Sequence, residues 1–376
     1  MNATPNGYEY DRADAPADAL RLHLNENTGG CSPAVIARVA AVSSTTLAQY
    51  PDYAAVTRTV AGHIGIAASR VLLTNGLDEG ILAVALAQLR NPYNPPRAPG
   101  GEDADRATGH RASGTSEQSR TEAVILEPAF GMYADSVEAV GGQVVQVMPG
   151  PDLTLDRAAI ATAVTPRTGV LFVASPGNPS GRSLTSDEIA WLASLLPEGA
   201  LLLLDEAYVE FAPGSFLPHL SDHPNVVIGR TFAKAYGLAG LRAGAVIAGH
   251  AVIDRLRRVI PPYSLNVFVV AALEAALGDR AYMLQYLDQV RESKQRLYAA
   301  CDRWGLPYLT SDANFVLVRA DDRRQALLDG LQARHIYIRD RDRQPGCAGC
   351  VRVTTGLVAH TQACIDAIEE ILCARA

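Results

Sequence analysis

The sequence predicts an α/β protein: a large domain with a mostly parallel central sheet flanked by helices, followed by a smaller α+β domain. Short apolar runs alternate with helical stretches through the first two thirds of the chain. Residues 169–174 and 201–204 are apolar throughout, which is typical of strands that helices cover on both faces. From about Pro261 the order of strands and helices changes, which indicates the second domain.

The composition is that of a globular enzyme. Of 376 residues, 48% are hydrophobic and 19% are charged, and this length allows two domains. The net charge of -7 disfavours nonspecific binding to nucleic acid or to membranes. We find no run of 18 apolar residues and no signal-peptide pattern at the N-terminus, so we expect a cytoplasmic protein without membrane spans.

Six cysteines are present, and two of them have the spacing of half a zinc site. Cys347 and Cys350 are separated by two residues, but no second cysteine pair or spaced histidine pair accompanies them. We therefore expect free thiols here and no metal site.

Residues 1–30 are expected to form an N-terminal arm. The run Leu22-His23-Leu24 leads into Asn25-Glu26-Asn27 and two glycines, as a strand end that turns into a loop. These polar side chains can contact a ligand or form an Asx-type turn. Ser32 and Pro33 then begin a helix to Val42, as N-cap and first helical residue.

Residues 31–260 are expected to form the large domain. The sequence predicts strands at residues 71–74, 123–126, 143–147, 169–174, 201–204, 226–228 and 245–248, with helices between them, one over residues 81–89. Thr185 and Glu188 form a capping box for one of these helices. Residues 91–121 have almost no large apolar side chain, so we expect a disordered insertion loop whose role the sequence does not give.

Residues 261–376 are expected to form the smaller domain. A long helical stretch covers residues 268–304. After it the sequence predicts strands at 314–318, 336–339 and 351–354, a helix at 323–333 and a final amphipathic helix.

Polar side chains recur where apolar strands end, at Asn75, Asn178, Asp205 and Lys234. In open α/β sheets, ligands bind at the carboxyl edge of the strands, so we expect these residues to share a site. At Asn75-Gly76 a strand turns into a helix, an arrangement that binds phosphate through backbone N–H groups.

Lys234 is one of only two lysines in the chain. It lies among small and apolar residues, whereas Lys294 lies in a charged run that predicts the solvated face of a helix. A lysine amine can form a Schiff base once its pKa is lowered, and an arginine cannot. A lysine that caps a helix or pairs with a carboxylate is the alternative reading of this residue.

Several motifs together resemble a known family. They are Asn25-Glu26-Asn27, Tyr50-Pro51, Asn75-Gly76 with Asp78-Glu79, Glu127-Pro128-Ala129-Phe130-Gly131-Met132-Tyr133, Asn178-Pro179-Ser180-Gly181, Asp205-Glu206-Ala207-Tyr208, the segment 229–242 around Lys234, Asn314-Phe315-Val316-Leu317-Val318, Arg339-Asp340, and Val351-Arg352-Val353. In this order and spacing they resemble the fold-type I, pyridoxal-phosphate-dependent aminotransferases of class I and II. Within that group the chain is most similar to histidinol-phosphate aminotransferases, from Leu22 to the C-terminus except for the 91–121 insertion.

The resemblance implies pyridoxal 5′-phosphate as cofactor and a role for each matching residue. It implies catalytic roles for Lys234 as Schiff-base lysine and proton shuttle, Asp205 at the pyridine nitrogen, and Asn178 and Tyr208 at the phenolic oxygen. It implies that the rest of the cofactor contacts Gly76, Leu77, Asp78, Phe130, Thr231 and Arg242, with Tyr50 supplied by the partner subunit of a homodimer. It implies substrate contacts for Asn25, Tyr263, Asn314, Arg339 and Arg352.

The implied reaction is transfer of an amino group from L-histidinol phosphate to 2-oxoglutarate, so the partners are a small amino donor and a 2-oxo acid. An aromatic or other amino-acid aminotransferase, a pyridoxal-phosphate-dependent decarboxylase or cyclase, and a noncatalytic binding protein are alternatives. Arg339 lies in an alternating-charge run that can also be a solvated loop, and Tyr263 can serve packing alone. Ala233 stands where the family usually has serine or threonine, which puts the exact substrate in question.

Overall fold

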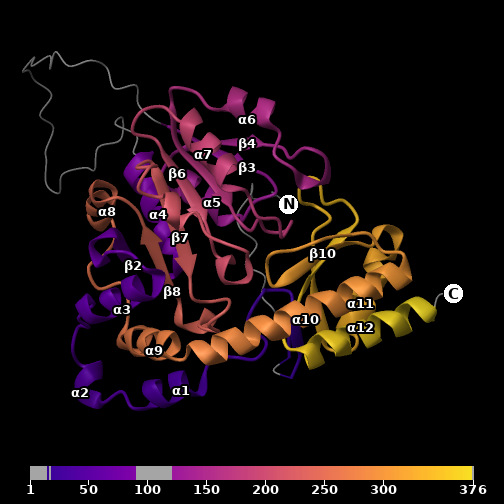
Figure 1. Cartoon of the computed structure of the whole chain (residues 1–376). Coiled ribbons are helices and arrows are strands. Elements are labelled where there is room, and N and C mark those ends of the chain that lie inside the picture. The colour runs from indigo at the N-terminus through magenta and orange to yellow at the C-terminus, as the bar shows by residue number, and fades with distance from the viewer. Residues whose placement is uncertain (1–14, 17, 90–120, 375–376) are drawn as a thin grey trace, which may run out of the picture.

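The structure is a computed structural model that describes residues 15–16, 18–89 and 121–374. The first 14 residues of the expected arm and residues 91–120 of the expected insertion loop lie outside this description. The described chain builds a seven-stranded and a five-stranded sheet, each with helices packed on it (Figure 1).

The seven-stranded sheet has the order β2-β8-β7-β6-β5-β3-β4. Its strands are β2 (Val71–Asn75), β3 (Glu122–Leu126), β4 (Gln143–Val147), β5 (Thr168–Ala174), β6 (Leu201–Asp205), β7 (Val226–Thr231) and β8 (Ala243–Ile247). All neighbouring strands are parallel except β8, which is antiparallel to both β2 and β7. The predicted, mostly parallel sheet is confirmed, and the carboxyl ends of six strands lie along one edge.

Helices cover both faces of this sheet, which explains its entirely apolar strands. Leu202 and Leu204 pack into the core of one face, and Leu201 and Leu203 into the core of the other. The first core includes residues of α1 (Pro33–Ala40), α3 (Ala54–Ile64), α6 (Arg157–Ala163), α7 (Ser186–Leu195) and α9 (Val267–Gly278). The second includes residues of α4 (Gly76–Gln88), α5 (Met132–Ala139) and α8 (His250–Arg257).

The five-stranded sheet has the order β1-β11-β12-β10-β9 and is covered by helices on one face. Its strands are β1 (Leu20–Leu22), β9 (Tyr308–Leu309), β10 (Phe315–Arg319), β11 (Ile336–Asp340) and β12 (Cys350–Thr354). The helices are α10 (Arg280–Trp304), α11 (Arg324–Gln332) and α12 (Val358–Cys373). β1 is parallel to β11 and the other pairs are antiparallel, so residues 20–22 of the expected arm form an edge strand here.

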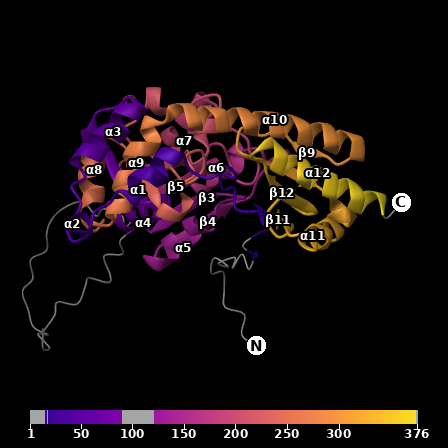
Figure 2. The same cartoon turned by 90° about the horizontal axis from the view of Figure 1, so that it is seen from below.

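Helix α10 joins the two bodies. Met283 near its beginning packs into the core of the seven-stranded sheet, and Leu297 further along packs into the core of the five-stranded sheet. Figures 1 and 2 show this helix running from one body to the other. The domain bounds at residues 30 and 260 stay a prediction.

The remaining helices are short. They are α2 (Ser44–Leu47) and the 3-10 turns η1 (Ala68–Arg70), η2 (Pro151–Leu153), η3 (Val209–Phe211), η4 (Leu217–His219), η5 (Ala239–Leu241) and η6 (Asp321–Arg323).

Local signals explain where several helices begin. The capping box of Thr185 and Glu188 is present at α7. The expected single helical stretch over residues 268–304 is two helices, because Asp279 ends α9 and its side chain accepts a hydrogen bond from the Tyr282 N–H of α10. Helix α4 begins at Gly76, earlier than the expected Ile81, since Gly76 at φ 75° turns the chain directly from strand into helix.

Lys294 differs from its expected environment. Its side chain is half-buried rather than solvated, and Nζ donates to the Ser311 carbonyl at 2.6 Å. Burial lowers its pKa.

Candidate active site

Lys234 lies just after β7, in the turn that leads to β8, at the carboxyl edge of the large sheet. Its Nζ donates to the Leu24 carbonyl at 3.1 Å and lies 5.9 Å from the centre of the Tyr208 ring. Its positive charge acts to lower the pKa of Asp205. The structure thus brings the N-terminal segment, β6 and β7 together around this amine.

Asp205 is the last residue of β6, and its side chain is buried. One carboxylate oxygen accepts a hydrogen bond from the Tyr133 hydroxyl at 2.6 Å, and the other accepts one from the Ala207 N–H at 2.9 Å. Burial raises the pKa of Asp205 to about 6, against the effects of these hydrogen bonds and of Lys234. A buried carboxylate held this firmly suits a cationic partner.

Tyr133 is a site residue to which the sequence assigned no role. It is fully buried, it stacks on Phe172 with ring centres 5.2 Å apart, and burial raises its pKa well above the usual range. The hydroxyl therefore stays protonated and donates to Asp205. Phe130, expected to stack on a cofactor ring, lies edge-on to Tyr133 at 5.9 Å.

A buried hydrogen-bond network holds the N-terminal segment against the small sheet. The Asn25 amide donates to the Tyr208 hydroxyl at 2.9 Å, and the Thr354 hydroxyl donates to the Asn25 side-chain oxygen at 3.0 Å. The Asn314 amide donates to the Asn25 carbonyl at 3.1 Å. Asn25 has φ 56°, a conformation that asparagine tolerates better than most residues, so both asparagines fix the backbone here.

Arg352 of β12 is buried and reaches from the small sheet to the large one. One Nη donates to the Asn178 side-chain oxygen at 2.5 Å and the other to the His23 carbonyl at 2.5 Å. Its guanidinium carbon lies 5.2 Å from the centre of the Phe315 ring. On β11, Arg339 is directly opposite Arg352, so both side chains start on the same face of the sheet.

The N-terminus of α4 forms an anion-binding corner. The first amides of a helix have no intrahelical acceptor, and no side chain caps this helix. Arg242, at φ 57°, pairs with Asp78 and packs so closely on Gly76 that a Cβ there would lie 2.6 Å from its Nη2. Leu77 is buried behind the turn. Amides, helix dipole and guanidinium together suit a phosphate group.

Thr231 and Ala233 border this corner on the β7 side. The Thr231 hydroxyl accepts a hydrogen bond from the Ala233 N–H at 3.2 Å, and both residues are buried. Ala233 itself offers no side-chain hydroxyl.

Tyr50 and Tyr263 lie on the surface. Their rings stack on each other with centres 4.2 Å apart, and they are 78% and 55% exposed. The structure therefore places these two predicted site residues together, at a face that a partner can cover.

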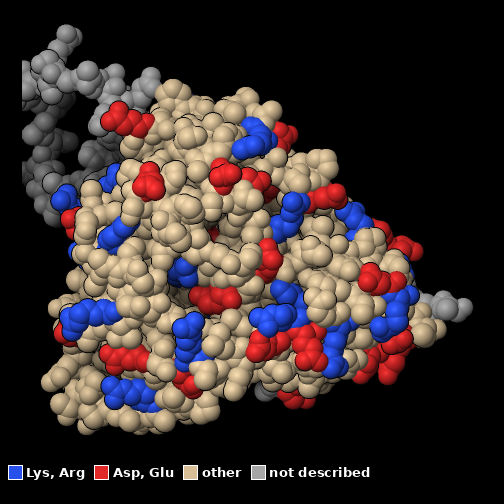
Figure 3. Space-filling view, in the orientation of Figure 1, with Lys and Arg blue, Asp and Glu red and all other residues tan. Residues whose placement is uncertain are grey.

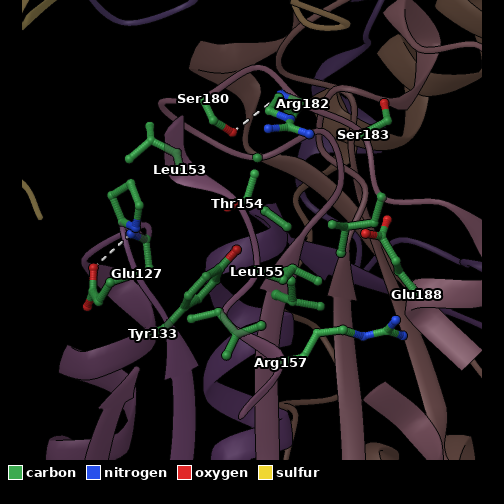
Figure 4. A pocket seen from close by; sticks show the side chains of 17 residues that line it. Glu127, Tyr133, Leu153, Thr154, Leu155, Arg157, Ser180, Arg182, Ser183 and Glu188 are labelled. Atoms are coloured by element: carbon green, nitrogen blue, oxygen red, sulfur yellow. Dashed lines mark hydrogen bonds between the residues drawn. The ribbon is translucent and has the colours of Figure 1, made fainter. Parts of the chain in front are cut away.

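A cavity of about 170 Å³ lies beside Tyr133 (Figure 4). It is bordered by the loop after β3, residues 153–157 and residues 177–184. Arg157, Arg182 and Glu188 contribute charged side chains to its wall. Tyr133, which donates to Asp205, lines this cavity.

Charge, metal and membrane features complete the description. On the face shown in Figure 3, basic and acidic side chains are interspersed. Among the described residues, no cluster of three or more His, Cys, Asp or Glu side chains could hold a metal ion, and no helix could span a membrane. Cys347 and Cys350 are buried free thiols.

Comparison with known proteins shows the family. Residues 106–369 match the sequence model described as "Aminotransferase class I and II". The chain is 32% identical over 363 residues to histidinol-phosphate aminotransferase 2 of Pseudomonas fluorescens (strain Pf0-1), covering 95% of this chain and 90% of the relative. It is 34% identical over 365 residues to histidinol-phosphate aminotransferase of Dinoroseobacter shibae, covering 95% and 92%.

A solved structure shares the fold. It is histidinol-phosphate aminotransferase from Sinorhizobium meliloti, in complex with pyridoxal-5′-phosphate, with a TM-score of 0.80 and 24% identity, covering 95% of this chain and 91% of that one. The fold and the strand-edge site define an α/β group-transfer enzyme with an anionic cofactor. The chain belongs to the class I and II aminotransferases.

The cofactor of this family is pyridoxal 5′-phosphate, and the residues present fit it. The corner of α4 and Arg242 suits its phosphate, the buried Asp205 carboxylate suits its protonated pyridine nitrogen, and the Lys234 amine suits its covalent attachment. The predicted enzyme class and cofactor are thus confirmed, while the roles of individual residues stay predictions.

Proposed function

We propose that this enzyme transfers the amino group of L-histidinol phosphate to 2-oxoglutarate, giving imidazole acetol phosphate and L-glutamate. The observation that carries the proposal is the pairing of Arg339 and Arg352 on neighbouring strands, next to Asn178. A substrate phosphate has two negative charges and three acceptor oxygens, more than one guanidinium can satisfy. The names of the full-length relatives support the same substrate.

When bound, pyridoxal 5′-phosphate supplies an electron-accepting ring that stabilises negative charge at the substrate Cα. Lys234 would hold the cofactor through its amine and would move the proton at the substrate Cα. Asp205 keeps the pyridine nitrogen protonated, and the Tyr133 hydroxyl fixes the carboxylate that does so. The Asn178 amide and the Tyr208 hydroxyl would donate hydrogen bonds to the phenolic oxygen.

The same proposal assigns the cofactor's other contacts. The phosphate would be held by the backbone N–H groups of Gly76, Leu77 and Asp78, by the Thr231 hydroxyl and by Arg242, which the Asp78 carboxylate positions. Phe130 would cover one face of the cofactor ring. With Ala233 in place of a hydroxyl residue, one phosphate hydrogen bond is absent, which costs about 1–2 kcal/mol of cofactor binding.

Substrate binding is assigned to the small-sheet side. Arg352 binds the carboxylate of glutamate or 2-oxoglutarate. For histidinol phosphate, Arg339 and Arg352 together bind the substrate phosphate. Asn25 and Asn314 shape this pocket because their hydrogen bonds fix the backbone around Asn25 against the small sheet.

The experiment that tests the reaction is an amino-donor panel with 2-oxoglutarate and the cofactor-loaded enzyme. It compares histidinol phosphate, phenylalanine and arginine by glutamate formation. We expect histidinol phosphate to have the highest kcat/KM. Turnover of phenylalanine without turnover of histidinol phosphate would reject the proposal in favour of an aromatic aminotransferase.

Arg339 offers a test of the phosphate subsite. In Arg339→Leu we expect KM for histidinol phosphate to rise about 10- to 100-fold, because a charge-assisted hydrogen bond to the phosphate is lost. Steady-state kinetics measure the change. Arg343→Leu, an exposed position in the same charged run, is the matched control and should leave KM unaltered. Equal effects in the two variants would mean that Arg339 only belongs to a solvated loop.

We also propose a homodimer in the cytoplasm, with small molecules as its only substrates and no nucleic-acid or membrane partner. Exposed apolar side chains recur at Ile36, Leu47 and Tyr50, and Tyr50 is stacked on Tyr263. Such a surface suits a subunit interface. Across it, Tyr50 reaches the cofactor phosphate of the partner, and Tyr263 borders the substrate pocket.

Tyr50→Asp is expected to shift the enzyme from dimer to monomer and to weaken cofactor binding about tenfold, because a charge is buried in the interface and a hydroxyl contact is lost. Sedimentation velocity and cofactor titration measure the two effects. Leu284→Asp, at an exposed apolar residue of α10, is the control. A wild-type protein that sediments as a monomer would contradict the dimer.

A further inference from the structure

His23 is a buried histidine that the resemblance gives no role. Its side chain is 6% exposed, and neither ring nitrogen makes a hydrogen bond of normal geometry to another described residue. Burial and the charges of Arg21 and Arg352 lower the pKa of His23, and they outweigh the charge of Glu26 and a poorly aligned contact with the Tyr337 backbone, which both favour the protonated ring. A buried polar ring without a normal hydrogen bond costs stability, so it calls for a partner such as water or a ligand.

The strand register places His23 beside the two arginines. Leu22 of β1 is opposite Ile338 of β11, and both pack into the helix-covered core. The residues that follow them, His23 and Arg339, therefore start on the other face of the sheet. Arg352 is opposite Arg339 on the next strand, so these two arginines and His23, the residue directly after β1, lie in one row on this face.

Two further contacts locate the ring and the backbone of His23. The ring lies 5.9 Å from that of Tyr337, which is on the same face of β11 as Arg339. The His23 carbonyl accepts a hydrogen bond from Arg352, whose other nitrogen donates to Asn178. His23 is thus tied to the residue that joins both sheets at the site.

We infer that His23 is the third donor of the substrate's phosphate subsite and determines specificity for a phosphate-bearing amino donor. This inference rests on the proposed function and extends its substrate site. Even a neutral imidazole donates one N–H, so the role needs no protonation. Two guanidinium groups and this N–H together reach the three oxygens of a phosphate.

The carboxylate of glutamate needs the His23 donor less than a phosphate does. Its two oxygens match the paired N–H groups of a single guanidinium. The loss of His23 should therefore separate the two substrates of this enzyme, whereas a loss of general packing should affect both alike.

The test is His23→Leu in the cofactor-loaded enzyme. We expect KM for histidinol phosphate to rise about 10- to 100-fold, as for loss of a hydrogen bond to a charged group. The glutamate half-reaction, followed by cofactor absorbance, should change less than about threefold. His23→Gln, which restores an N–H donor, should recover most of the loss.

His360→Leu is the matched control, because His360 is also partly buried with an unpartnered Nδ1 but lies on α12, at the helix-covered side of the sheet. It should leave both reactions unaltered. Equal losses with histidinol phosphate and glutamate in His23→Leu, or no rescue by His23→Gln, would overturn the inference.

Failure of the proposed function has a different signature. If the wild-type enzyme does not turn over histidinol phosphate, the proposed reaction is wrong whatever His23 does. The subsite is then tested with inorganic phosphate as an inhibitor of the glutamate half-reaction. Weaker inhibition in His23→Leu than in wild type would support a phosphate subsite for another donor, and equal inhibition would overturn it.

Discussion

Lys234→Ala is expected to lower kcat/KM by at least ~10⁴-fold, the scale seen when a covalent catalytic residue is removed. The variant loses both the amine that attaches the cofactor and the base that moves the Cα proton. Its visible absorbance should change from that of lysine-bound cofactor to that of free cofactor, and dialysis should then remove the cofactor. Spectra before and after dialysis, with single-turnover rates, measure these effects.

Lys294→Ala is the natural control, since the chain has only these two lysines. Lys294 donates to the Ser311 carbonyl on the small-sheet side and has no place in the site. We expect its cofactor spectrum to match that of the wild type. If Lys234→Ala kept the wild-type spectrum, attachment at Lys234 would be excluded.

Asp205→Asn is expected to lower kcat by about 10²- to 10⁴-fold, because the pyridine nitrogen loses the buried anion that keeps it protonated. Rapid-scan absorbance and kcat measure the loss. Tyr133→Phe, which removes only the hydroxyl donor to Asp205, should cost much less. A kcat near the wild-type value in Asp205→Asn would refute the pairing with the pyridine nitrogen.

Asp205→Asn should lower activity but raise the free energy of unfolding of the cofactor-free protein. Burial raises the pKa of Asp205 from 3.8 to about 6, so between these values the folded protein keeps a proton that the unfolded chain releases. This contribution to stability is present at low pH and is lost as pH rises through 6. At pH 8 the ionised carboxylate costs about 3 kcal/mol, at roughly 1.4 kcal/mol per pKa unit.

Urea unfolding of the cofactor-free protein at pH 5 and pH 8 measures this effect. Asp205→Asn should raise the unfolding free energy at pH 8, and raise it by about half as much at pH 5, which lies between the two pKa values. A variant less stable than the wild type at pH 8 would contradict the raised pKa.

Strand patterning predicted much of the fold, because a sheet covered on both faces leaves entirely apolar strands such as β5 and β6. The strand-edge rule then indicated Asp205 and Lys234, since each follows such a strand. The break at Asp279 was missed although Gly278 precedes it, because a single glycine is tolerated inside a helical pattern; the Asp279 side chain, which caps α10, makes the break. The early start of α4 was missed because the positive φ of Gly76 is not visible in the pattern.

Contacts between distant segments could not be predicted from single strands. Tyr133 meets Asp205 across 72 positions, and its place in the Glu127–Tyr133 motif was the only hint. The row of His23, Arg339 and Arg352 depends on the register of three strands, two of them joined by a nine-residue connection and the third from the start of the chain. Register is set by tertiary packing, which local periodicity does not report.

Helix α10 belongs to both hydrophobic cores, and at 25 residues it is about 37 Å long. A rod fixed at both ends couples the two bodies mechanically. Arg339 and Arg352 are paired on neighbouring strands, so a rotation of the five-stranded sheet relative to the seven-stranded sheet would move both together. Such a rotation would have to break the hydrogen bond between Arg352 and Asn178. If Arg352 binds the substrate as proposed, entry of the substrate and loss of the Arg352–Asn178 hydrogen bond are coupled.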